Sequence, residues 1–117
     1  MITIRDMKKI LTILSLKYKL PKITIQIKST RCGRARFRTN KITLPKWIFT
    51  RIKEYQLYYI IHEICHFITL QGHTDKFKQV ETDILKEYNI LPIYNKAYPK
   101  ELRDLSGKVL CNNYGVK

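Results

Sequence analysis

The chain is poor in several features that would place it in other classes of protein. It has three cysteines, Cys32, Cys65 and Cys111, and no Cys-x-x-Cys pair. An odd, scattered set argues against a disulfide framework and against a zinc site built from cysteines. No apolar run approaches the roughly 20 residues that a membrane-spanning helix needs. We therefore expect an intracellular, cytoplasmic protein that does not enter a membrane.

Acidic residues are missing from a long part of the chain. There is no Asp or Glu between residues 7 and 53, where fourteen Lys and Arg occur, and the other residues hold nine basic and nine acidic side chains. The whole net charge of +14 therefore lies before the middle of the chain. Such one-sided basicity suggests a polyanionic partner, most simply DNA. The alternative is a solvated, solubilising surface, or a lysine-rich composition.

Length and pattern predict a single α+β domain over residues 1–117, with a basic half (1–53) and a metal-site half (54–117). At 117 residues with 44% hydrophobic residues, the chain can bury an ordinary core. Apolar periodicity predicts an N-terminal helix at 5–18, a long helix at 53–70 and another at 75–88. Alternating residues predict strands at 22–28, 34–38 and around 42–44 in a small three-stranded antiparallel sheet. We expect a monomer.

The second of these strands carries arginine on one face, at Arg34, Arg36 and Arg38. Residues on one face of a strand lie about 6.5–7 Å apart, comparable to the phosphate spacing along one nucleic-acid strand. The three arginines are therefore candidate nucleic-acid contacts. An edge strand whose charges discourage aggregation is the alternative.

Histidine is scarce, and its distribution is the most informative feature of the sequence. The three histidines, His62, His66 and His73, fall in one short window. His62 and His66 enclose Glu63 in an H-E-x-x-H arrangement, which places both imidazoles on one face of a helix. Gly72 is expected to end that helix in a left-handed conformation. His73 then lies in a turn from which it can reach back to the other two.

These residues are the parts of a mononuclear zinc site. Catalytic zinc takes three protein ligands and keeps one position open, so we predict His62, His66 and His73 as ligands and Zn²⁺ as cofactor. Glu63 would act as the general base for attack of a zinc-bound water on a peptide carbonyl. Cys65 is expected in the core. Asp75 either bonds a ligand imidazole or favours the next helix's N-terminus.

The motif resembles that of SprT-like (Spartan-like) zinc metallopeptidases of the zincin group. The resemblance runs from about Cys32 to Tyr88 and depends on His62-Glu63-Ile64-Cys65-His66, Gly72-His73 and Phe77-Lys78. It implies a minimal zincin-like protease domain, protein substrates associated with or crosslinked to DNA, and the same ligands and base. Many bacterial relatives also carry a C-terminal zinc ribbon of paired cysteines, whereas only Cys111 occurs here.

Two other functions fit part of the pattern. A metal-dependent nuclease can use three histidines at similar spacing, although Glu63 directly after the first histidine favours peptide hydrolysis. A non-catalytic nucleic-acid-binding module with structural zinc is the other alternative, but it would need a fourth protein ligand. The stabiliser of the tetrahedral oxyanion stays open among Tyr94, Tyr98 and the tyrosines of the motif helix.

Overall fold

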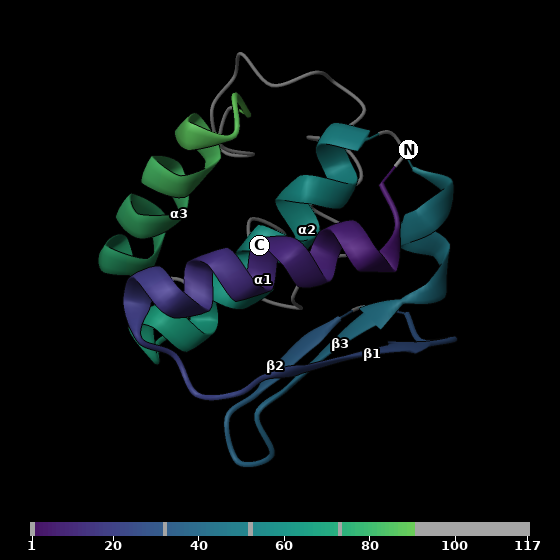
Figure 1. Cartoon of the computed structure of the whole chain (residues 1–117), viewed down its shortest axis with the longest axis horizontal. Coiled ribbons are helices and arrows are strands. Elements are labelled where there is room, and N and C mark those ends of the chain that lie inside the picture. Colours follow the sequence, from purple (N-terminus) through teal and green to yellow (C-terminus); the bar gives the residue numbers. More distant parts are fainter. Residues whose placement is uncertain (1, 32, 52, 73, 91–117) are drawn as a thin grey trace.

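The computed structural model describes residues 2–31, 33–51, 53–72 and 74–90. The elements within these ranges are α1 (Ile4–Tyr18), β1 (Thr24–Lys28), β2 (Arg34–Arg36), β3 (Lys41–Pro45), the 3₁₀ helix η1 (Lys46–Thr50), α2 (Lys53–Thr69) and α3 (Asp75–Glu87). The three α-helices lie on one side of the small sheet (Figure 1). This arrangement confirms the predicted α+β class, and none of the described helices is long and apolar enough to cross a membrane.

The sheet is mixed, so the prediction of an antiparallel sheet was wrong for one of its two strand pairs. Its order is β1-β3-β2, with β2 antiparallel and β1 parallel to β3. β3 carries Ile42 and Leu44, both fully buried, and it takes the central position. The chain leaves β1, forms β2 at the far edge of the sheet in the opposite direction, and then turns back into β3. β3 therefore runs parallel to β1 and lies between the other two strands. The 12 residues of that crossover are enough to allow parallel pairing.

The strand register divides the sheet into an apolar face and a polar face. Paired residues share a face, and successive residues alternate. Ile25 pairs with Ile42 and Ile27 with Leu44, and this apolar face packs into the core beneath the helices. The opposite face, which we call the outer face, carries these residues: Thr24, Gln26, Lys28, Arg34, Arg36, Lys41 and Thr43.

α2 is the central element of the core. It is buried on nearly every side, because α1, α3, η1 and the sheet all contact it. Its aromatic residues extend this packing: the rings of Tyr55 and Trp47 stack at 6.2 Å, and Tyr59 meets Trp47 edge-on at 5.8 Å. Trp47, in η1, also donates its indole N–H to the Arg31 carbonyl at 3.1 Å. Trp47 therefore anchors η1 to both α2 and the connection between β1 and β2.

Gly33 marks a close approach between the sheet and α2. Its N–H donates to the hydroxyl of Tyr59 at 2.6 Å. A Cβ atom at this position would lie 2.6 Å from the Thr43 carbonyl oxygen and 2.7 Å from Cε1 of Tyr59. Only glycine leaves room for this contact, which ties the start of β2 to the helix that carries the histidines.

Candidate metal centre

His62 and His66 lie one turn apart on α2, and the structure brings their rings together as the motif predicted. Their centroids are 5.0 Å apart, with ring planes at 90°. Two imidazoles bound to one tetrahedral zinc, at Zn–N distances of 2.0–2.1 Å, have ring centres about 5 Å apart. The spacing of the pair therefore fits a shared Zn²⁺.

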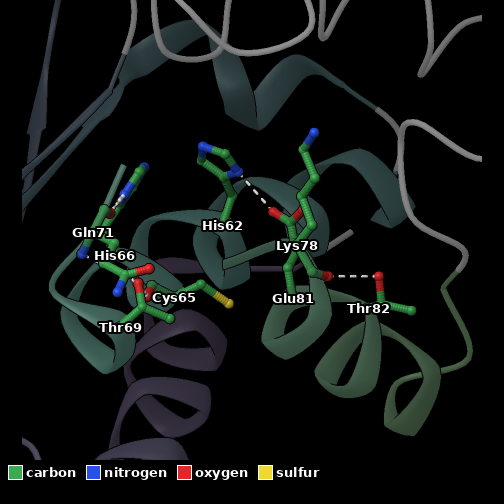
Figure 2. Close-up of polar contacts among 8 residues, drawn as sticks. All are labelled: His62, Cys65, His66, Thr69, Gln71, Lys78, Glu81 and Thr82. Atoms are coloured by element: carbon green, nitrogen blue, oxygen red, sulfur yellow. Dashed lines mark hydrogen bonds and ion pairs between the residues drawn. The ribbon is translucent and has the colours of Figure 1, made fainter. Parts of the chain in front are cut away.

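The first imidazole is held by a carboxylate of the neighbouring helix. Nδ1 of His62 lies 2.7 Å from Oε2 of Glu81 on α3, and both side chains are fully buried (Figure 2). An ionised carboxylate only accepts hydrogen bonds, so Nδ1 carries the proton and donates it. The lone pair of His62 is then on Nε2, the nitrogen through which this tautomer can bind a metal.

The second imidazole is held by the chain that follows its own helix. Nδ1 of His66 lies 2.8 Å from the backbone carbonyl oxygen of Gln71, which can only accept. Nε2 of His66 is therefore the nitrogen with the lone pair. The two histidines thus adopt the same tautomer through two unrelated partners, and both carry the lone pair that could bind a metal on Nε2.

The turn that delivers the Gln71 carbonyl differs from the expected glycine stop. α2 ends at Thr69, and Leu70 adopts the left-handed conformation with φ 54°, so the prediction of a left-handed Gly72 was wrong. The N–H of Leu70 donates to the His66 carbonyl at 2.8 Å, and the chain reverses there. Reversal at this position brings Gln71 back over His66. A reversal two residues later would not.

Phe77 of α3 fixes the two rings from one side. It is fully buried, and its ring centroid lies 5.0 Å from that of His62 and 4.5 Å from that of His66. α3 therefore contributes both the carboxylate and the aromatic ring that orient the candidate ligands. Its N-cap is Thr74, whose hydroxyl accepts from the N–H of Phe77 at 3.3 Å.

Burial keeps both imidazoles neutral. It lowers the pKa of His62 to about 3. Burial and the neighbouring His62 lower the pKa of His66 to about 4, although the Gln71 carbonyl opposes this shift. Neutral imidazole is the form that binds a metal, so neither ring has to lose a proton at neutral pH before it can act as a ligand.

Glu63 and Cys65 lie on the same turns of α2, and both are fully buried. Burial, together with the carboxylates of Glu81 and Glu63, raises the pKa of the Cys65 thiol well above its usual value. A thiol that stays protonated is a poor metal ligand. This agrees with the predicted position of Cys65 in the core. The effect on the thiol pKa also shows that the Glu63 carboxylate lies near Cys65.

The remaining predicted residues have different outcomes. His73, Tyr94 and Tyr98 lie outside the described residues, and within the described part of the chain no group of three His, Cys, Asp or Glu is arranged to hold a metal. His73 as third ligand therefore stays a prediction.

Asp75 is exposed at the first turn of α3, and Glu81 makes the contact with an imidazole that was considered for Asp75. Tyr58 has its ring 5.8 Å from that of His62.

Sequence reasoning missed Glu81, although the sequence contains a signal for it. Glu81 follows Phe77 by one helical turn and precedes Ile84 by three residues, so it occupies a core position of an amphipathic helix. Carboxylates are almost never fully buried without a partner. A glutamate at a core position, in the helix directly after H-E-x-x-H, therefore predicts a buried polar partner, and a histidine of the motif is one candidate.

Comparison with known proteins adds a fold relationship. No protein-family model matches the chain, and no curated protein matches its sequence. Two solved structures resemble it. The metallopeptidase zymogen jannalysin of Methanocaldococcus jannaschii has a TM-score of 0.61 at 23% identity, over 86% of this chain and 92% of that one. The zymogen of Pyrococcus abyssi abylysin has a TM-score of 0.53 at 18% identity, over 73% and 97%.

At these identities the likeness establishes the fold. It agrees with the minimal zincin-like domain that the SprT-like resemblance implied, and in this chain the long histidine-bearing helix α2 contacts both the sheet and α3. Both similar structures are metallopeptidase zymogens. The SprT-like assignment stays a prediction.

Proposed function

We propose that the protein is a zinc-dependent endopeptidase. The observation that supports this most directly is the pair of buried, neutral imidazoles one helical turn apart, each held at Nδ1 so that its lone pair is on Nε2. Glu63 directly follows the first of them on the same helix. The fold shared with two metallopeptidase zymogens supports the same chemistry.

In this proposal each side chain has a separate role. His62, His66 and the predicted third ligand His73 hold the metal, with Glu81, Gln71 and Phe77 fixing the first two rings. Zinc, when bound, polarises the substrate carbonyl and lowers the pKa of water. Glu63 accepts the proton of the attacking water and returns it to the leaving amine. The fully buried position of Glu63 keeps bulk water away from this proton transfer.

The proposal is tested with purified protein, one equivalent of Zn²⁺ and an unstructured protein substrate such as casein. Glu63→Gln should keep the bound zinc and lose about 10²–10⁴-fold in hydrolysis rate, the usual contribution of a general base. His62→Ala and His66→Ala should lose the metal itself. Hydrolysis that is unchanged in Glu63→Gln would rule out the mechanism, and cleavage of RNA in place of protein would support a nuclease.

The third ligand is tested separately. His73→Ala should reduce zinc affinity about as strongly as His66→Ala does, since each supplies one of three bonds. Retention of full affinity would show that another residue completes the site.

We further propose that the substrates are DNA-associated proteins, as the SprT-like resemblance implies. The concentration of positive charge before residue 54 supports this. It is tested by adding DNA to the hydrolysis assay with a DNA-bound basic protein as substrate. If DNA leaves the rate unchanged, the peptidase proposal stands but the DNA link does not.

A further inference from the structure

A groove lies between α1 and β1, beside one edge of the sheet. It has a volume of about 440 Å³, and residues of the helix, the strand and their connection line it. Its apolar lining consists of Leu11, Leu16, Leu20, Ile23 and Ile25. Leu16 is 78% exposed, more than any other exposed large hydrophobic side chain of the described residues. The helix and the strand therefore leave apolar surface uncovered between them.

β1 is an edge strand of the described sheet, and part of its backbone faces this groove side. The N–H of Thr24 donates to the Asn40 carbonyl at 2.9 Å, so the backbone of Thr24 faces β3. Backbone groups of successive residues in a strand alternate in direction, so those of Ile25 and Ile27 point away from β3. Both side chains are only half-buried, although their partners on β3 are fully buried. Such an edge can pair with a further extended chain.

Positive charge surrounds the groove. Lys8 of α1 and Lys22 before β1 line it, Lys28 ends β1, and all three are exposed. The ion pairs found in the described part of the chain involve none of these lysines. Opposite charges attract across paired strands, so a chain that pairs with β1 is favoured when it is acidic. A second copy of this protein, with its own net charge of +14, would be repelled.

The groove is distinct from the candidate metal centre and from the arginine strand. Its lining residues belong to α1, β1 and their connection, whereas the strand tied to α2 through Gly33 is β2, at the opposite edge. Arg34 and Arg36 are exposed on the outer face of β2. Arg38 was predicted on the same strand, but it lies in the turn to β3. Contact of these arginines with nucleic acid stays a prediction.

We infer that the groove binds an extended segment of another protein in which apolar and acidic residues alternate. The segment pairs with the outward backbone groups of Ile25 and Ile27 and adds a strand to the sheet. Successive side chains of a strand point to opposite faces, so its apolar side chains enter the groove below α1. Its carboxylates then face the side of the sheet that carries Lys28. The inference does not depend on the peptidase chemistry.

The probe is a short fluorescein-labelled peptide in which valine alternates with glutamate. Binding is followed by anisotropy with the full-length Glu63→Gln protein, so that hydrolysis cannot remove the probe. Peptides with lysine in place of glutamate, or serine in place of valine, should bind at least about 10-fold more weakly. An absence of saturable binding would overturn the inference, and so would equal affinity of either control peptide.

Methylation of alternate peptide nitrogens tests strand pairing. A strand presents its N–H groups alternately at its two edges, so only one of two methylated probes, on all valine or on all glutamate nitrogens, blocks the edge that meets β1. That probe should lose about 10-fold in affinity or more, while the other should bind like the unmethylated peptide. Loss on valine methylation would indicate antiparallel pairing, and loss on glutamate methylation would indicate parallel pairing. Equal affinity of the two would rule out strand addition.

Apolar variants on α1 test the groove itself. Leu16→Ser should weaken probe binding about 3- to 10-fold, because apolar contact area is lost. Ile13→Ser is the matched control, since Ile13 is 57% exposed on the same helix but outside the lining of the groove. Equal effects of the two variants would contradict the inference. Sedimentation equilibrium should give a monomer. A wild-type dimer that Leu16→Ser dissociates would place a second copy in the groove and overturn it.

Charge variants test the lysines. Lys22→Glu combined with Lys28→Glu should weaken probe binding about 10-fold, because two exposed ion pairs are lost and replaced by repulsion. Lys46→Glu combined with Lys76→Glu makes the same change of net charge at exposed positions away from the groove and should alter affinity little. Equal effects of the two pairs would mean that net charge alone attracts the probe, and the inference would fail.

Discussion

Glu81 offers the sharpest test of the candidate metal centre, because its carboxylate contacts the first candidate ligand, His62. Its carboxylate lies 2.7 Å from Nδ1 of that histidine, and neither side chain is exposed to solvent. Replacing a residue that orients a metal ligand lowers metal affinity about 10–100-fold, or about 1.4–2.7 kcal/mol. Glu81→Ala should show a loss in this range. Glu81→Gln should lose less, since its amide oxygen still accepts the bond, although without the charge.

The assay is zinc competition against a chromophoric chelator, combined with urea unfolding of the metal-free protein. In the metal-free protein, Glu81→Ala should also cost about 1–3 kcal/mol of unfolding free energy, because a buried N–H loses its acceptor. Asp83→Asn is the matched control, because it neutralises an exposed carboxylate on the same helix that bonds only to Gln79 among the described residues. The control should change neither quantity.

Two results would refute the reasoning. If Glu81→Ala bound zinc as tightly as the wild type, the carboxylate would have no part in orienting the ligand. If it lost as much affinity as His62→Ala, Glu81 would be a metal ligand itself, and the positioning role would be wrong.

Three further predictions follow from the geometry. The pKa values of about 3 for His62 and about 4 for His66 lie below the usual 6.5, so the unfolded chain takes up protons first as the pH falls. Metal-free stability should be constant above pH 7 and fall from pH 6 to 4, by at most about 2.7 kcal/mol per pH unit for the two groups, as urea titrations at each pH will show. Gly33→Ala should lower the unfolding free energy by about 1–3 kcal/mol, since its Cβ would meet the Thr43 carbonyl and the Tyr59 ring. Leu70→Gly should raise it by about 1 kcal/mol with zinc affinity kept, because the side chain is 68% exposed and the left-handed backbone suits glycine.

Local rules predicted the parts of the site that lie within one helix. The i, i+4 spacing of His62 and His66 was enough to place the two rings together, and apolar periodicity located α1, α2 and α3 to within a few residues. The apparent glycine stop was misleading, because Gly72 is simply exposed and has open space around it, while Leu70 makes the reversal. The residue type indicates where a left-handed backbone costs little free energy. The contact between the Gln71 carbonyl and His66 decides where the chain turns.

Contacts between elements were harder to predict. Glu81 reaches His62 only because α3 packs against α2, and a sequence pattern does not say which core position of one helix meets which position of another. The parallel pairing of β1 with β3 was hard to predict for the same reason, because it is a contact between separate elements. Alternation identified each strand and its apolar face, but the choice of central strand depends on how Ile42 and Leu44 are buried beneath the helices.

The contact between α3 and His62 also sets an order of events during synthesis. The ribosome releases α2 before α3, so the two histidines emerge while their orienting residues are still in the exit tunnel or unmade. Gln71 becomes available to His66 almost at once, whereas Phe77 and Glu81 follow only with the next helix. A nascent chain that has passed Gln71 but not α3 therefore has the two candidate ligands of α2 without the residues that align His62. If the site binds zinc as proposed, tight metal loading should begin only after residue 87 has left the tunnel.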